Sequence, residues 1–378
     1  MNKNNYSKIF WISVLAGITL RFVLMTLGHN FDFESYCIVG ELAAQGKNVY
    51  AHTGRYNYGP VWFTLLGILW NIASYFQQNI FVFRILIVSV LTLTDILIAK
   101  FISERAGNLW GAVFILNPIS LIITGYHNQF DNLAVLFGLY GVLFLEGSYA
   151  ERDIKFKDIA GIIFCSLSLI TKHILWSFPL YILFSTTINA HKKILYAFIP
   201  PVIFLLSFMP FMREGWHGIL HNVFLYRSFN NFPLFAFGIL NHFGLYIPLQ
   251  KYICVPVFGL LMLCSAYVFR RENIFNSFML YTISLVCFSS AIANQYIAIP
   301  CMALIILMRI KSALYFIPGA IFLSCNVNGL HIPFYLQEHF GIQINFFTRI
   351  ISGGNMYTLL AWVLLLCLIL YCRDKNLH

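Results

Sequence analysis

Composition places the chain in a membrane. Of its 378 residues, 60% are apolar and only 10% are charged, whereas a soluble domain carries about 25% charged residues. The formal net charge is +10, but no run of Lys or Arg exceeds two residues. Such basic residues orient membrane helices from short loops, so nucleic acid is not expected as a partner. A soluble fold is excluded, and the sequence predicts one all-α polytopic membrane domain over residues 1–378.

The first apolar run, residues 9–28, is long enough to cross the bilayer and lacks an A-x-A cleavage site. We therefore expect a retained first span. Asp32 and Glu34 follow it directly. Residues 33–45 then show helical apolar spacing that ends at Gly46, which predicts a short helix lying on the membrane.

Apolar stretches of spanning length recur to the end of the chain and predict about a dozen transmembrane helices. Segment 59–76 is long enough to cross, but it begins at Gly59-Pro60 and is rich in aromatic residues. The other predicted spans are 80–100, 109–125, 132–148, 159–171, 174–190, 194–211, 252–270, 274–293, 296–310, 312–327 and 354–371.

Charge decides between the two arrangements of segment 59–76. If it lies in the interface, 15 of the 24 basic residues fall on one side, close to span ends. The positive-inside rule favours that arrangement and makes both termini cytoplasmic. The polar loops then all lie on the extracytoplasmic face: 29–58, 126–131, 172–173, 212–251, 294–296 and 328–353.

The first of these loops holds the leading candidates for chemistry. Asp32 and Glu34 stand beside the membrane in a chain with only 14 acidic residues, which favours a site that handles a proton or a cation. The alternative is a solvated loop start. Tyr56 and Tyr58 suit the interface, where the ring lies in lipid and the hydroxyl in water.

Two further loops carry polar side chains. Asn117-Pro118 should bend its span, after which His127, Gln129 and Asp131 emerge outside. An ordinary hydrated turn is the alternative there. Lys172-His173 separates two apolar runs, and a lysine at membrane depth needs a partner or a water-filled cavity, unless it is an anchor that reaches the interface.

The loop from residue 212 to 235 mixes aromatic residues with Arg213, His221 and Arg227, and arginine is suited to phosphate recognition. His217 and His221 are four residues apart, but neither an HExxH motif nor a third ligand is evident. A phosphate-handling surface is therefore favoured over a metal site, and no metal ligands are assigned.

Charged residues also fall within predicted spans, at Arg21, Arg84 and Asp95. The last two are about 16 Å apart along one helix, so they cannot pair directly. Each should have a partner on another helix or face a cavity, and Asp95 is expected to be structural.

These residues together resemble the GT-C superfamily of polyprenyl-phosphate-sugar-dependent glycosyltransferases. Stretch 32–36 is similar to the acidic motif of the first external loop, and 46–60 to the region that follows it in the catalytic subunit of GPI mannosyltransferase I. Gly59 stands where threonine is typical there. Lys172-His173 resembles a pair in the lipid-linked glucosyltransferases of N-glycan assembly. Residues 117–118 with 128–131, and Gln295-Tyr296, are similar to motifs of the GPI enzyme.

The resemblance implies a GT-C fold of about 12 transmembrane helices with interfacial helices in the first external loop. The short loops and compact length favour a bacterial plasma membrane. A GT-C module would cover about residues 1–190, and a variable helical part about 191–378. The activity implied is inverting transfer of a hexose, with mannose favoured, from a polyprenyl-phosphate-sugar donor to a lipid-linked or cell-surface glycan acceptor. No cofactor is required and a divalent cation is optional.

The roles implied are as follows. Asp32 is the general base and Glu34 orients Asp32 or the acceptor. The donor phosphate is bound by Arg227, Arg213, His221 and Lys172. The sugar or acceptor is bound by Tyr56, Tyr58, His127, Gln129, Asp131, His173, Gln295 and Tyr296.

Three other functions remain open. A flippase or transporter of a lipid-linked saccharide should show repeated halves and mid-span polar residues, and no internal repeat is evident. An oligosaccharide polymerase would also place its catalytic groups outside. A structural membrane subunit is the third.

Overall fold

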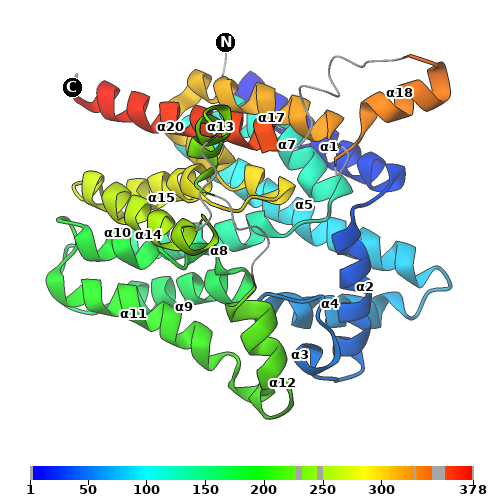
Figure 1. Cartoon of the computed structure of the whole chain (residues 1–378), viewed down its shortest axis with the longest axis horizontal. Coiled ribbons are helices and arrows are strands. Elements are labelled where there is room, and N and C mark those ends of the chain that lie inside the picture. Colours follow the sequence, from blue (N-terminus) through cyan, green and yellow to red (C-terminus); the bar gives the residue numbers. More distant parts are fainter. Residues whose placement is uncertain (1–2, 227–231, 245–249, 327–328, 343–353, 377–378) are drawn as a thin grey trace.

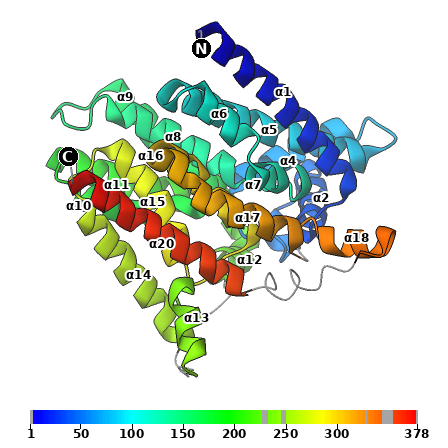
Figure 2. The same cartoon turned by 90° about the horizontal axis from the view of Figure 1, so that it is seen from above.

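The computed structural model describes residues 3–226, 232–244, 250–326, 329–342 and 354–376, all of which are helix or connecting segments without strands. Arg227 therefore lies outside the described residues. The helices lie mostly side by side in a layered bundle, with the short helices α2 to α4 at one end of it (Figures 1 and 2). The chain is an all-α membrane protein.

The amino-terminal half consists of α1 (Lys3–Leu27) to α10, with short π-helical or 3-10 segments η1 and η2. The bounds are α2 (Phe31–Ala44), α3 (Val49–His52), α4 (Pro60–Ala73), α5 (Asn79–Ala106), α6 (Asn108–Ile115), α7 (Pro118–Leu121), η1 (Ile122–Tyr126), α8 (Asp131–Glu146), α9 (Phe156–Thr171), η2 (His173–Leu175) and α10 (Phe178–Phe184).

The carboxy-terminal half continues the bundle from α11 (Ala190–Leu206). Its other elements are η3 (Met209–Phe211), α12 (Met212–Gly218), η4 (Ile219–Phe224), α13 (Leu234–His242), α14 (Gln250–Val268), α15 (Ile274–Phe288), η5 (Asn294–Ala298), α16 (Cys301–Met308), η6 (Arg309–Ser312), α17 (Ala313–Cys325), α18 (Ile332–Phe340) and α20 (Gly354–Asn376).

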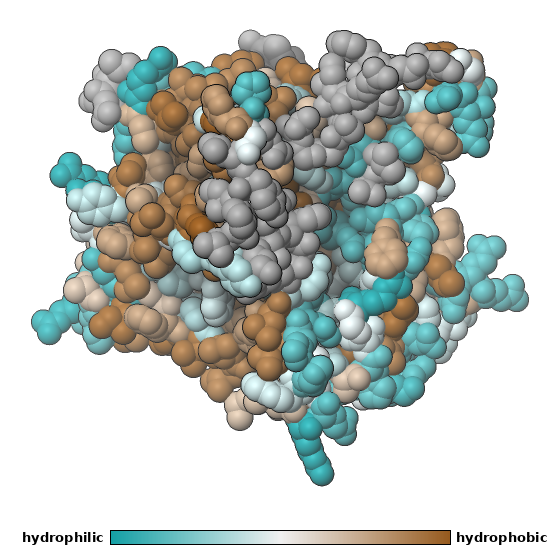
Figure 3. Space-filling view, in the orientation of Figure 1, coloured by the Kyte–Doolittle hydropathy of each residue, from teal (hydrophilic) through white to brown (hydrophobic). Residues whose placement is uncertain are grey.

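Several helical stretches meet the length and hydropathy needed to cross a bilayer. There are five within the described residues: Ser7–Leu27, Asn79–Ala106, Ala190–Phe224, Asn294–Cys325 and Met356–Lys375. Two bent helix pairs raise this to seven if each pair is one span. The count of about a dozen therefore remains a prediction. Apolar side chains cover much of one side of the molecule in Figure 3, and polar ones gather at the other.

Breaks within the apolar stretches explain why length alone misleads. At Asn117-Pro118 the helix axis bends by 44°, as predicted, and Asn117 caps α7 by accepting from the backbone of Ile119 at 3.1 Å. At Lys172 the axis turns by 110°. The stretch Asn294–Cys325 doubles back at Arg309. This reversal brings the Tyr315 hydroxyl to the Ile297 carbonyl, to which it donates at 3.1 Å.

The short helix predicted after the first span is α2, and Gly46 follows it with a φ of +69°, as expected for a C-terminal glycine. Segment 59–76 forms α4, which packs against α2. Both helices have 14 residues and lie at one end of the bundle (Figure 1).

Basic residues at the opposite end of the bundle connect several helix ends. Arg309 donates to the Ala106 carbonyl at the end of α5 at 2.6 Å, and Lys311 pairs with Asp374 at the end of α20 at 2.5 Å. Arg105 pairs with Glu146 at the end of α8 at 3.0 Å. The ends of three helices and the α16–α17 turn thus meet.

The buried charges within the helices are satisfied by one another. Arg21 pairs with Asp95 at 2.8 Å, both fully buried, and Asp95 also accepts from Ser120, Thr124 and Asn132 at 2.7 to 2.9 Å. The expectation that Asp95 has a partner on another helix is confirmed. This network fixes α1, α5 and the bent span against α8.

Candidate functional site

Asp32 lies in the first turn of α2. Asn30 explains its position, because the Asn30 side chain caps the helix by accepting from the Asp32 backbone N–H at 3.1 Å. The Asn30 amide also donates to Oδ2 of Asp32 at 3.3 Å. A carboxylate in a first helical turn is further favoured by the helix dipole. The cap therefore sets both the start of α2 and the orientation of Asp32.

The segment after η1 supplies a second hold on the same oxygen. Gln129 donates from Nε2 to Oδ2 of Asp32 at 2.5 Å, and its Oε1 accepts from the buried Tyr36 hydroxyl at 3.2 Å. The tyrosine donor fixes which way the amide faces. Asn30 and Gln129 both donate to Oδ2, and Oδ1 of Asp32 has no hydrogen bond within the described residues. Among these residues, one carboxylate oxygen is therefore held and the other has no partner.

Arg84 holds the segment that carries Gln129 against the end of α1. Its guanidinium donates to the Asn128 side chain at 2.9 Å, to the Tyr126 carbonyl at 3.3 Å and to the Gly28 carbonyl. Asn128 has a φ of +58°, a left-handed conformation that turns the chain sharply between His127 and Gln129. The predicted partner for Arg84 outside its own helix is confirmed.

His127 lies beside the same cap. Its Nδ1 is 3.2 Å from the Asn30 side-chain nitrogen, and it is buried. Burial lowers the pKa of His127 to about 4, so the ring is neutral at neutral pH. Its Nε2 has no partner within the described residues.

Lys172 is a buried charge with a partner rather than an anchor at the interface. Its Nζ is 2.7 Å from Oδ2 of Asp131, and both side chains are at most 2% exposed. The ammonium also lies 4.9 to 5.3 Å from the ring centroids of Phe130, Tyr58 and Tyr296. The alternative of a lysine that reaches for the interface is wrong here, because Asp131 and the aromatic rings stabilise its charge in place.

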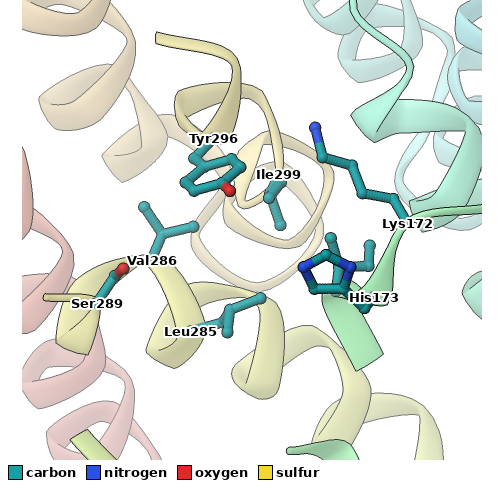
Figure 4. A pocket seen from close by; sticks show the side chains of 8 residues that line it. Lys172, His173, Leu285, Val286, Ser289, Tyr296 and Ile299 are labelled. Atoms are coloured by element: carbon teal, nitrogen blue, oxygen red, sulfur yellow. The ribbon is translucent and has the colours of Figure 1, made fainter. Parts of the chain in front are cut away.

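A cavity of about 120 Å³ opens beside this pair. Figure 4 shows the His173 ring and the Tyr296 ring bordering it, with the Lys172 side chain along one edge. Leu285, Val286 and Ile299 supply apolar wall, and Ser289 lies at the rim. Nδ1 of His173 and Oδ1 of Asp131 are buried without hydrogen-bond partners in the described part of the chain. Of the two residues, His173 lines the cavity, so its Nδ1 is a candidate partner for a hydroxyl group of a ligand.

Tyr58 lies beside His173, which lines this cavity. Its ring lies 6.2 Å from the His173 ring and 4.9 Å from that of Phe130. Burial, and then the charges of Tyr296, Asp32, Asp131 and Tyr226, raise the pKa of Tyr58 well above its ordinary value. The hydroxyl is therefore protonated, and it makes no hydrogen bond within the described residues, so it can donate one.

Not every predicted site residue joins the cluster. Glu34 is half exposed and faces Arg55 at 3.7 Å, whereas the groups that hold Asp32 are Asn30 and Gln129. Tyr56 is buried, and its hydroxyl donates to the Gly59 carbonyl at 2.5 Å while it accepts from the Phe63 N–H at 3.1 Å. Its hydroxyl thus stabilises the turn before α4.

Arg213 and His221 lie on α12 and η4, of which α12 packs on α3 with Gly215 and Gly218 against Tyr50. The rings of His217 and His221 are 4.2 Å apart. Gln295 lies in η5 beside Tyr296. No group of three or more His, Cys, Asp or Glu side chains fit to hold a metal ion occurs in the described residues.

The sequence alone did not single out two residues of the cluster, Asn30 and Tyr36. Asn30 carries a readable signal, since asparagine before an acidic first turn is a favoured helix cap. Tyr36 carries none, because a tyrosine in an apolar helix is usually core. Arg55 lies outside the cluster; it faces Glu34, and its guanidinium lies 3.8 Å from the Phe31 ring centroid.

No comparison with a known protein bears on this site. The sequence matches no family model, and neither the characterised proteins nor the solved structures with which it was compared contain a match.

Proposed function

We propose that the chain is a membrane glycosyltransferase of the GT-C type, with about twelve spans, that transfers a hexose from a polyprenyl-phosphate donor. The observation that carries the proposal is the Asp32 carboxylate, which is held on Oδ2 by two amides and has no hydrogen bond to Oδ1 among the described residues. A general base needs a fixed carboxylate with an accessible lone pair. The neutral donor Tyr58 and the Lys172–Asp131 pair lie nearby.

In the proposed reaction, Asp32 takes the proton of an acceptor hydroxyl as that oxygen forms a bond to the anomeric carbon. The bond from the anomeric carbon to the phosphate oxygen breaks, and its electron pair leaves with the polyprenyl phosphate. Attack opposite to the leaving group inverts the configuration. Alignment of acceptor and donor supplies much of the rate.

Sugar hydroxyls need donors and acceptors at the end of an apolar cavity. Tyr296 and His173 supply them in the lining of the cavity of about 120 Å³, and the Tyr58 ring lies 6.2 Å from the His173 ring. The donor tail would remain in the bilayer, so a nucleotide is not needed. Gln129 positions Asp32, and we assign it that role in place of direct sugar contact.

The leaving phosphate requires positive charge. Arg227, Arg213 and His221 remain proposals for this role. Lys172 is the weakest of the four, because its charge is balanced by Asp131 at 2.7 Å. The location proposed is a bacterial plasma membrane, with both termini cytoplasmic and the site on the extracytoplasmic face.

The test is transfer of radiolabelled sugar in membranes that contain the protein, with polyprenyl-phosphate-mannose and then the glucose donor. Protein-dependent movement of label to a lipid or glycan acceptor supports the proposal. Failure with every polyprenyl donor, together with protein-dependent movement of a lipid-linked saccharide across vesicles, would replace it with a flippase.

A further inference from the structure

Asn30 stands between α1 and α2, and its side-chain amide makes three contacts. Its Oδ1 accepts from the Asp32 backbone N–H at 3.1 Å, which fixes the way in which the amide faces. The Nδ2 atom carries two hydrogens, and two acceptors lie near it: Oδ2 of Asp32 at 3.3 Å and Nδ1 of His127 at 3.2 Å. Asn30 thus links the start of α2, the carboxylate and the imidazole.

The contact with Asn30 determines the state of the His127 ring. Nδ2 of Asn30 can only donate, so Nδ1 of His127 has to accept and the ring proton lies on Nε2. The other tautomer, or a protonated ring, would place two N–H groups against each other at 3.2 Å. Burial lowers the pKa of His127 to about 4, so the ring is neutral at neutral pH. Nε2 has no partner among the described residues, so the contact with Asn30 is the one that selects the tautomer.

The backbone around His127 holds the ring in place. The His127 N–H donates to the Ile122 carbonyl at 3.0 Å, at the end of the π-helical turn η1, and Asn128 follows with a φ of +58°. The Asn128 side chain accepts from Arg84 at 2.9 Å and donates to the Thr124 carbonyl at 3.1 Å. The His127 side chain is 1% exposed, which leaves little surface for a sugar.

We propose that His127 is a positioning residue for Asp32 that acts through Asn30. By accepting one hydrogen of the Asn30 amide, the imidazole directs the other at Oδ2 of Asp32, where Gln129 also donates. This role takes the place of direct sugar contact by His127.

The physical reason is the second hydrogen of the Asn30 amide. Without an acceptor at Nδ1 of His127, that hydrogen would lack a partner in a partly buried place. The amide could recover the lost bond by rotating towards water, which would draw its first hydrogen away from Oδ2 of Asp32. That Asp32 is a general base rests on the proposed function. The hydrogen bond from Asn30 to His127 does not, so the two can fail separately.

The test compares two substitutions of His127, of which only one can accept a hydrogen bond. Asparagine places an amide oxygen about where Nδ1 lies, whereas leucine fills similar space without an acceptor. His127→Leu should lower the turnover number for sugar transfer by about tenfold or more and change the KM for the donor by less than about twofold. His127→Asn should stay within about threefold of the wild-type turnover number.

A substitution of Asn30 tests the link itself. Asn30→Ser keeps a side chain that caps helices but removes the amide, so it should lower the turnover number as much as His127→Leu does. Asn189→Ser is the matched control, because Asn189 caps α11 by the same kind of bond, from the His191 N–H at 3.1 Å. It should keep the wild-type turnover number.

A second measurement does not depend on sugar transfer. In ¹⁵N NMR of the full chain labelled at histidine, the His127 signal is identified by its loss in His127→Asn, and it should show the neutral Nε2–H tautomer. An Nδ1–H tautomer or a charged ring at neutral pH would overturn the proposal, even if the variants fail to fold. Equal turnover numbers for His127→Leu and His127→Asn would also overturn it. The Nε2–H tautomer in a wild-type protein that transfers no sugar would reject the proposed function and keep the hydrogen bond.

Discussion

At the residue scale, hydrogen bonds from Asn30 and Gln129 hold one oxygen of Asp32, Oδ2. Tyr36 orients Gln129, and Gln129 holds Oδ2 of Asp32. A chain of this kind acts as a unit, because each group fixes the geometry of the next. The energetic coupling between Tyr36 and Gln129 can therefore be measured with a double-mutant cycle.

We expect Gln129→Leu to lower the turnover number by about 10- to 100-fold, the usual loss when a positioning partner is removed. Tyr36→Phe should have a smaller effect, and the double variant should be no slower than Gln129→Leu alone. Gln45→Leu, at an exposed glutamine just after the same helix, is the control. Additive losses in a double-mutant cycle would show that the two residues act independently.

His127 gives the fold a dependence on pH. Its pKa is about 4 in the folded protein and about 6.5 when unfolded, so the unfolded chain binds the proton more tightly. The stability that comes from burying the neutral His127 ring is present above pH 6.5 and is lost as pH falls towards 4. Lowering the pH from 7 to 5 should therefore reduce the free energy of unfolding by about 2 kcal/mol.

Thermal unfolding in detergent checks this expectation. The stability of His127→Gln should fall less between pH 7 and pH 5 than that of the wild type. His191→Gln, at an exposed histidine, should keep the wild-type slope. Identical slopes for all three proteins would contradict the assigned burial effect.

At the scale of elements, the contact between α4 and α9 brings Tyr58 to Lys172. Gly59 makes this approach possible: a Cβ there would lie 2.1 Å from the Ile170 carbonyl oxygen. A threonine at this position could not fit without moving α9. Glycine thus has a steric reason at residue 59.

We therefore expect Gly59→Ala to reduce transfer by more than about tenfold and to destabilise the protein by about 1–3 kcal/mol, because backbone must move. Gly54→Ala is the matched control, since nothing lies within 4 Å of its added Cβ. Activity and unfolding midpoint are measured for both. A Gly59→Ala protein that behaves like Gly54→Ala would show that the approach is not tight.

The local features of this site could be predicted from sequence, whereas its long-range contacts could not. Gly46 and Asn117-Pro118 act through neighbouring backbone, and both behave as expected. Gln129 and Asp32 are 97 residues apart, and spacing along the chain does not predict which polar groups meet. The sequence left two roles open for Lys172, a buried charge with a partner or an anchor at the interface, because its partner Asp131 lies on another helix.

At the scale of the whole molecule, polar clusters lie at two ends. The Asp32 cluster is at the end with α2 and α4, and the contacts of Arg309, Lys311 and Arg105 are at the other. Spans could be counted only approximately from sequence, because an apolar run does not show whether a helix bends, stops or doubles back within it.

The orientation proposed for these ends predicts which positions an impermeant reagent reaches. In a background without the nine native cysteines, His52→Cys should react with an impermeant maleimide in intact cells. Lys155→Cys, also exposed, should react only after permeabilisation. The reverse pattern would place the Asp32 cluster on the cytoplasmic side.

The measurement that tests the central claim most directly is single-turnover sugar transfer by Asp32→Asn, with donor binding measured on the same preparation. Asparagine keeps the size of the side chain and cannot accept the proton. Transfer should fall by about 100- to 10,000-fold with donor affinity unchanged, and Glu41→Gln, an exposed acid on the same helix, should resemble wild type. Wild-type transfer by Asp32→Asn would contradict the account.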